Sequence, residues 1–142
     1  MTTSIIIDKL NKLTIEHSED YDHLEVVDEL TNYLRQNSDG YLACEALINL
    51  LERHPEVEFG TPGEPVHTLE TLTGYYEEFL LKSLEKHPTQ MTVWMLNRMM
   101  NGQEESYKKT LIQILNKCIM HPLADQQTIA IAKDCYDYQT GS

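Results

Sequence analysis

Apolar residues recur along this chain with the spacing of amphipathic helices. Positions i, i+3, i+4 and i+7 lie on one face of a helix, and most of the sequence follows this pattern. No stretch of useful length alternates between apolar and polar residues as a half-buried strand does. The pattern predicts an all-α fold of about seven helices. Their expected starts are at Ser4, Ser18, Ser38, Pro65, Thr89, Gln103 and Asp125.

Capping residues and glycines set the expected bounds of these helices. Ser and Thr accept hydrogen bonds from the free N–H groups of a first helical turn, and Gly often ends or interrupts a helix. The helix expected over 65–86 contains Gly74, where a break is possible. The residues expected to face inward are Ile7, Leu10 and Leu13 in the first helix, and Leu24, Val27, Leu30 and Leu34 in the second. The last residues, 138–142, are expected to be frayed.

Three His-Pro pairs punctuate the chain at 33- and 34-residue intervals, at His54, His87 and His121. Each helix should end there, because a residue before proline is disfavoured in the α conformation. A histidine at a helix C-terminus caps carbonyl groups, and the helix dipole favours its imidazolium form. The apolar residues before the pairs align as Leu47, Leu80 and Ile114; Ile48, Leu81 and Leu115; and Leu51, Leu84 and Cys118.

A period of about 34 residues with two helices in each repeat is typical of an α-solenoid. The tetratricopeptide pattern is missing from this sequence. We therefore expect a HEAT-like stack of antiparallel helical hairpins that forms a single domain over residues 1–142.

The charge of the chain is strongly negative and unevenly distributed. There are 23 acidic and 11 basic residues among 142, which gives a formal net charge of −12. Residues 1–72 hold 15 acids and 4 bases, so nearly all of the excess lies in the first half. Such a surface repels nucleic-acid phosphates and anionic lipids, so neither is an expected partner. A positively charged protein is favoured instead.

Two acidic segments are candidates for the surface that contacts this partner. Residues 16–29 hold seven acids and no base, and the loop at 55–64 combines three Glu with two Gly and two Pro. The turn-rich loop should hold its carboxylates in solvent, where they cannot pair internally. The alternative to a docking surface is that these acids form an ordinary solvated helix face. The predicted docking residues are Asp20, Asp22, Glu25, Glu56, Glu58 and Glu64.

The sequence has no motif that predicts catalysis, a metal or a cofactor. It lacks a phosphate-binding glycine loop, a nucleophile elbow, an HExxH motif and paired CxxC motifs. We therefore expect no enzyme, metal or cofactor. The three cysteines, Cys44, Cys118 and Cys135, have no paired spacing and suit a reducing cytoplasm. No apolar run is long enough to span a bilayer, and the N-terminus does not have the pattern of a secretory signal.

Two stretches resemble a known group of proteins. They are GTPGEPVH at 60–67, followed by Glu70, and PT at 88–89, followed by TVWMLNR at 92–98. Together they resemble small, acidic, all-helical bacterial immunity proteins of contact-dependent growth inhibition and polymorphic toxin systems. The resemblance covers roughly residues 60–98, about a quarter of the chain.

This resemblance implies a cytoplasmic protein that binds one cognate toxin domain and blocks it. Many such toxins are basic nucleases, and an RNase is the favoured target. The alternative function is a HEAT-like adaptor or scaffold that binds a basic peptide or subunit. Further candidates for contact with the partner are His67, Glu70, Trp94, Asn97 and Arg98. For His67 and Trp94 a purely structural role is the alternative.

Overall fold

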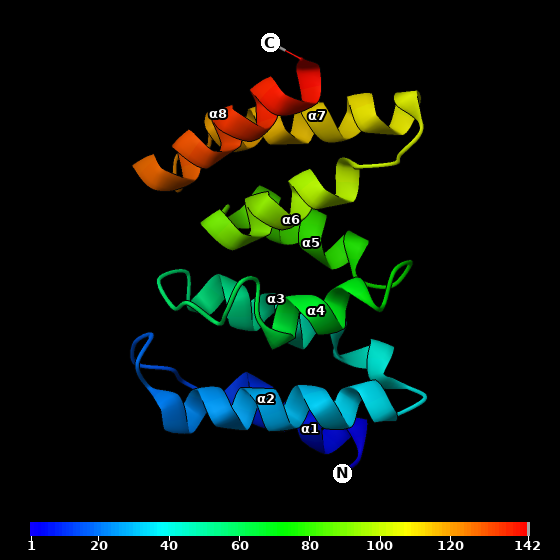
Figure 1. Ribbon diagram of the computed structural model, residues 1–142, viewed down its shortest axis with the longest axis vertical. Coiled ribbons are helices and arrows are strands. Elements are labelled where there is room, and N and C mark those ends of the chain that lie inside the picture. Colours follow the sequence, from blue (N-terminus) through cyan, green and yellow to red (C-terminus); the bar gives the residue numbers. More distant parts are fainter. Residues whose placement is uncertain (142) are drawn as a thin grey trace. The chain divides into compact units, whose positions relative to one another are not determined.

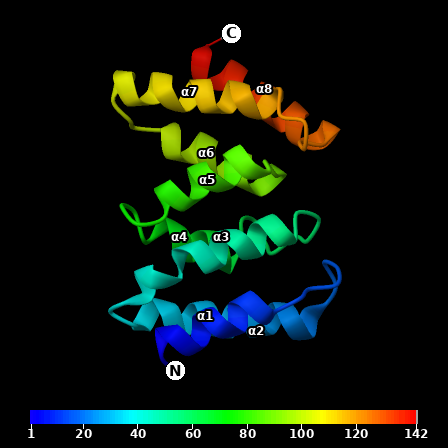
Figure 2. The ribbon, with the colours of Figure 1, turned by 180° about the vertical axis from the view of Figure 1, so that it is seen from behind.

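A computed structural model describes residues 1–141 of the chain and confirms the all-α prediction. The described residues form eight α-helices and one short 3₁₀ turn, with no strand (Figures 1 and 2). The helices are α1 (Thr3–Lys12), α2 (Tyr21–Gln36), α3 (Cys44–Arg53), α4 (Glu64–Glu70), α5 (Glu77–Lys86), α6 (Gln90–Met100), α7 (Glu105–Ile119) and α8 (Gln126–Thr140), and the 3₁₀ turn is η1 (Gly40–Ala43).

One more helix forms than the sequence predicts, because the segment 65–86 is divided into α4 and α5. The chain turns between Thr71 and Tyr76, and Gly74 in this turn has a positive φ of 97°. Glycine adopts this conformation without the strain that a Cβ atom causes. The expected break at Gly74 is therefore present.

The chain folds into two compact units, Met1–Phe79 and Leu80–Ser142. We call them the N-terminal unit and the C-terminal unit. The N-terminal unit contains α1 to α4 and the start of α5, and the C-terminal unit contains the rest of α5 and α6 to α8. None of the helices in the described range combines the length and apolar character needed to cross a bilayer.

The N-terminal unit is built from two helical hairpins that pack on each other. Helix α1 packs on α3, and α2 packs on α4. The core between them includes Leu10, Leu30, Leu47 and Leu69, each at most 2% exposed. At the C-terminus of α1, the Arg53 guanidinium donates to the carbonyl groups of Leu10 and Leu13. These interactions hold the two hairpins together.

The C-terminal unit centres on three helices, α6, α7 and α8, each of which packs against the other two. Helix α6 begins at a capping box, in which Thr89 and Thr92 each satisfy a backbone N–H of the other. Asp125 caps α8 through the Thr128 N–H at 2.7 Å. Both caps occur where the sequence predicts that these helices start.

The His-Pro pairs lie where α3, α5 and α7 end, as predicted, but the repeat is less regular than its sequence. Leu47 and Leu80 are fully buried, and Leu51, Leu84 and Cys118 are all at most 2% exposed. Ile114 is only partly buried, so the prediction that it lies in the core is wrong. Ile114 and Leu81 are the half-buried apolar residues of a hollow between α5 and α7, which the buried Leu84 and Cys118 also line.

Several expected boundaries and faces also differ. Helix α1 is capped by Thr2 instead of Ser4, and Ile6 with Leu10 forms its buried face, while Ile7 and Leu13 are half-buried. Helix α2 starts after Asp20 instead of Ser18. Of the tail expected at 138–142, residues 138–140 form the last turn of α8, and residue 142 lies outside the described residues.

Candidate functional site

Ser18 joins two loops that are far apart in the sequence. Its hydroxyl oxygen accepts the backbone N–H of Glu58 at 2.9 Å, and the same hydroxyl donates to the carbonyl of Glu56 at 3.4 Å. The first loop, 13–20, connects α1 to α2, and the second, 54–63, connects α3 to α4. Ser18 therefore does not cap α2, as the sequence suggests, but holds the two acidic segments side by side.

His54 makes a second connection between the same loops. Its Nε2 atom accepts the backbone N–H of Ile15 at 3.0 Å, and its Nδ1 atom lies 3.0 Å from the carbonyl of Leu50. Nε2 must be unprotonated to accept this bond, so Nδ1 carries the hydrogen and donates it to Leu50. The expected capping of α3 is confirmed, but the expected imidazolium is wrong, because this geometry needs the neutral ring.

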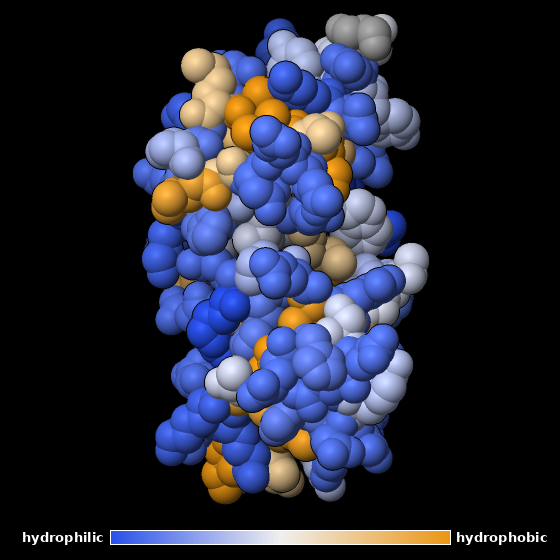
Figure 3. All heavy atoms as spheres, turned by 90° about the vertical axis from the view of Figure 1, so that its left-hand side faces the viewer, coloured by the Kyte–Doolittle hydropathy of each residue, from blue (hydrophilic) through white to orange (hydrophobic). Residues whose placement is uncertain are grey.

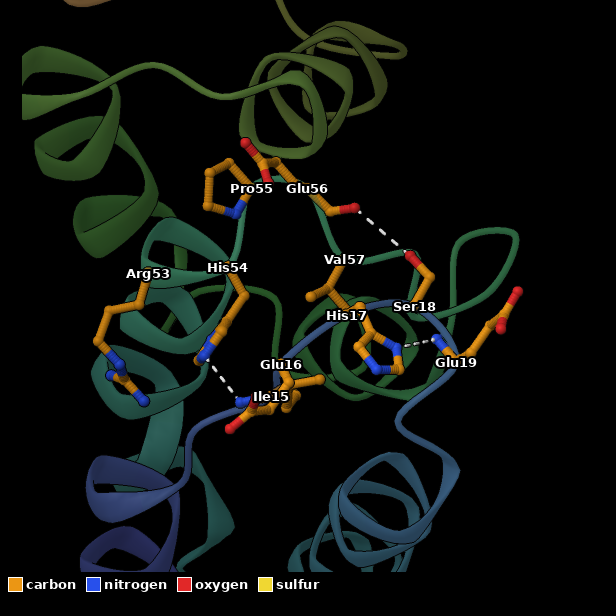
Figure 4. Close-up of a pocket in the computed structure, with 10 residues that line it drawn as sticks. All are labelled: Ile15, Glu16, His17, Ser18, Glu19, Arg53, His54, Pro55, Glu56 and Val57. Carbon is orange, nitrogen blue, oxygen red and sulfur yellow. Dashed lines mark hydrogen bonds between the residues drawn. The ribbon is translucent and has the colours of Figure 1, made fainter.

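The two loops line an open hollow of about 740 Å³ in the N-terminal unit (Figure 4). The rings of His17 and His54 lie between the loops, and Glu19 points away from the hollow. The lining residues come from 15–19 on one side and from 53–57 on the other. We call this feature the loop hollow.

Four exposed carboxylates stand on the two loops that form this hollow. They belong to Glu16, Glu19, Glu56 and Glu58. The surface at this end of the N-terminal unit is mostly hydrophilic, as the lower half of Figure 3 shows. Asp22 and Glu25 are also exposed, on the first two turns of α2 that follow directly. The structure thus brings both predicted acidic segments together around the loop hollow.

Asp20 has a structural task within this region. Its carboxylate accepts the backbone N–H of Glu16 at 3.0 Å and lies 2.7 Å from the His23 ring. The Glu16 hydrogen bond, followed by the one from His23, holds the pKa of Asp20 below its ordinary value. Asp20 therefore shapes the loop that carries the exposed acids.

Glu64 differs from the expectation that the loop carboxylates cannot pair internally. It forms an ion pair with Arg35 of α2, and Arg35 also donates to the Thr68 hydroxyl at 3.1 Å. Gly63, just before, has a φ of 99°, and a Cβ atom there would lie 2.5 Å from the carbonyl oxygen of Phe59. This tight turn brings Glu64 to α2, so the expectation is wrong for Glu64.

The two units differ strongly in net charge. Residues 1–79 hold 17 acids and 4 bases, a net of −13, whereas residues 80–142 hold 6 acids and 7 bases, a net of +1. Two of the four bases, Lys12 and Arg35, pair with Asp8 and Glu64, and Arg53 is engaged with carbonyl groups. Within the described residues no group of three His, Cys, Asp or Glu is arranged to hold a metal ion.

No protein-family model, curated protein or solved structure matches this chain.

The remaining predicted contact residues lie on α4 and α6. His67 is exposed on α4, and Glu70, at its end, is half-buried. On α6 the Arg98 guanidinium lies 4.8 Å from the centre of the Trp94 ring, a cation–π contact. The Asn97 side-chain oxygen accepts a hydrogen bond from Gln139 of α8 at 2.8 Å. Trp94 and Asn97 therefore have partners inside the C-terminal unit, which fits the structural alternative for Trp94.

The residues that assemble the loop hollow are not evident from the sequence. The sequence suggests a helix cap for Ser18 and gives His54 no partner outside its own helix. Ile15 carries no signal, because its contribution is a backbone N–H. Only the position of His54 at the end of α3 suggests a capping ring, and no pattern in the sequence specifies a partner 39 residues away.

Proposed function

We propose that this chain is an immunity protein that binds one basic toxin domain in the cytoplasm and blocks its activity. The observation that carries the proposal is the contact of Ser18 with Glu56 and Glu58. This contact gathers exposed carboxylates from two distant segments on one end of a unit with a net charge of −13. Like charges gathered in this way repel one another, and a cationic partner relieves that repulsion.

A nuclease is the class of toxin that this surface suits. Nucleases bind phosphate groups through Lys and Arg. Carboxylates on an inhibitor can bind the same Lys and Arg side chains in place of the phosphates. Long-range attraction also speeds the encounter of the two proteins, which matters for an inhibitor that must act before its target cuts nucleic acid. In this proposal the loop hollow and the start of α2 cover the active site of the toxin or a neighbouring exosite.

An adaptor that binds a basic peptide or subunit is the second candidate. The stacking of α1 on α3 and of α2 on α4 supports a HEAT-like arrangement, which adaptors often use. Both candidates place the partner on the acidic surface of the N-terminal unit. They differ in the effect on the partner, because only an immunity protein abolishes the enzymatic activity of its partner when one equivalent is bound.

The proposal is tested with the product of the neighbouring upstream gene as the candidate toxin. The two proteins should co-purify, and one equivalent of the chain should stop hydrolysis of RNA by the toxin. Complex formation without inhibition would favour the adaptor. Failure to co-purify, with full toxin activity in the presence of excess chain, would contradict the proposal.

The contribution of the acidic surface is measured with two matched sets of charge-neutralising variants. The first carries Gln at Glu16, Glu19, Glu56 and Glu58, and the control carries Gln at Glu104 and Glu105 and Asn at Asp134 and Asp137, which are also exposed but lie on the C-terminal unit. Both sets change the net charge by four. The first should slow association by about tenfold or more at low salt, while the control should change it much less.

A further inference from the structure

Two exposed tyrosines are stacked at the opposite end of the N-terminal unit from the loop hollow. The ring centres of Tyr41 and Tyr75 lie 4.6 Å apart, with 26° between the ring planes. Tyr41 is in η1, and Tyr75 is in the turn between α4 and α5; both segments lie at the same end of the unit (Figures 1 and 2). The structure thus brings together two aromatic residues that are 34 positions apart.

This pair remains accessible to solvent. Tyr41 is 38% exposed, Tyr75 is 53% exposed, and the neighbouring Leu42 is 57% exposed. Tyrosine is enriched among the residues that dominate binding at protein interfaces, because its ring buries a large area with little loss of side-chain freedom. An exposed, prestacked pair is therefore a suitable anchor point for a partner.

The charge around the pair selects the kind of partner. The segments 37–45 and 70–79, which carry the two tyrosines, contain five acidic residues and no Lys or Arg. The face of an aromatic ring attracts cations, and nearby carboxylates strengthen this attraction. The Arg98 guanidinium already lies on the Trp94 ring in the C-terminal unit, whereas the Tyr41–Tyr75 pair has no cation of its own in its two segments.

From these observations we infer that the Tyr41–Tyr75 pair binds an arginine side chain of the basic protein partner. Arginine is favoured over lysine, because its planar guanidinium stacks on aromatic faces while a lysine ammonium acts as a point charge. The inference rests on the proposed function, since it assumes a basic partner. It adds a second contact surface, outside the loop hollow, and specifies the residue that this surface recognises.

The test uses two synthetic peptides of equal charge, nona-arginine and nona-lysine. Their affinities for the full chain are measured by isothermal titration calorimetry at 150 mM salt. The chain should prefer nona-arginine by about threefold or more, the factor expected from one surface cation–π contact. Changing both tyrosines to Ala (Y41A/Y75A) should abolish this preference and leave the affinity for nona-lysine nearly unchanged.

Two further variants separate ring stacking from other effects. The double variant Y41F/Y75F keeps both rings and should retain the preference, so a loss there would contradict a role for the ring faces. Tyr138→Ala removes a 72% exposed tyrosine from the C-terminal unit and should also retain it. A circular dichroism melt of each variant checks that the helices are intact.

The outcomes distinguish this inference from the proposed function. Equal binding of both peptides, weakened by the Gln variants at Glu16, Glu19, Glu56 and Glu58, would overturn the tyrosine site and leave the acidic docking surface in place. An arginine preference that survives Y41A/Y75A would also overturn it. If neither peptide binds, the tyrosine site is overturned, and the proposed function is decided separately by co-purification with the toxin and inhibition of its activity.

Discussion

The Nε2 atom of His54 accepts the backbone N–H of Ile15 at 3.0 Å, across 39 residues of sequence. This one bond fixes the protonation of the ring, because the atom that accepts cannot also carry a hydrogen. It also connects the end of α3 to the loop that follows α1. The position of the exposed carboxylates around the loop hollow therefore depends on an uncharged histidine.

His54 and His121 should be neutral in opposite tautomers. In His121 the Nδ1 atom accepts the Leu123 N–H at 3.1 Å, and the Nε2 atom lies 2.7 Å from the Glu85 carbonyl, so Nε2 carries the hydrogen. In His54 the hydrogen is on Nδ1. Long-range ¹H–¹⁵N correlation spectra at pH 7.5 distinguish the two forms. The same tautomer in both rings would contradict these contacts.

Replacing His54 with Ala should lower the free energy of unfolding by about 1–3 kcal/mol. The change removes a cap from α3 and leaves the Ile15 N–H, which is part-buried, without its acceptor. Urea unfolding measures the effect. His67→Ala is the matched control, because His67 is exposed on α4, and it should change the free energy by less than about 0.5 kcal/mol.

Leu80 and Ile114 hold equivalent positions in the sequence repeat but should differ in their contribution to stability. Leu80 is fully buried, so Leu80→Ala should cost about 2–5 kcal/mol. Ile114 is half-buried beside the hollow between α5 and α7, so Ile114→Ala should cost only about 1 kcal/mol. Equal losses in the free energy of denaturant unfolding would show that Ile114 is packed as Leu80 is, as the sequence repeat predicts.

Acid should destabilise the N-terminal unit partly through Asp20. The Glu16 N–H and the His23 ring hold the pKa of Asp20 below its ordinary value in the folded state. Its contribution is therefore fully present above the unfolded-state pKa of about 3.9 and is lost as the pH falls through the lower, folded-state pKa. Unfolding free energies measured from pH 6 to pH 2.5 should depend less on pH in Asp20→Asn than in the unmodified chain. Asp22→Asn, at an exposed position, is the control.

The three cysteines should react slowly in the folded protein. Burial raises the pKa of Cys44 and of Cys118 to about 11, and burial together with Asp134 raises the pKa of Cys135. Since the thiolate is the reactive form, labelling with a disulfide reagent at pH 8 should be on the order of 100-fold slower than in urea. Cys135, 8% exposed, should react first. Rapid labelling of Cys44 would show that the core of the N-terminal unit opens.

The local sequence determined the helices and most of their ends. The apolar spacing predicted that Leu24, Val27, Leu30 and Leu34 face inward; the last three are buried, whereas Leu24 is half-buried. Proline, glycine and capping residues act within a few positions of themselves, which is why the ends at the His-Pro pairs, the break at Gly74 and the cap at Thr89 were predictable. The acidic composition was likewise evident without a structure.

The tertiary structure alone decided which distant groups meet. The sequence marks two acidic segments, but only the contact of Ser18 with Glu58 shows that they share one surface. The sequence predicts that Glu64 is unpaired, whereas Arg35 lies beside it in the fold. The stacking of Tyr41 on Tyr75 has no signal in the sequence. These contacts depend on the packing of whole helices and on backbone groups that every residue carries, so no local pattern in the sequence encodes them.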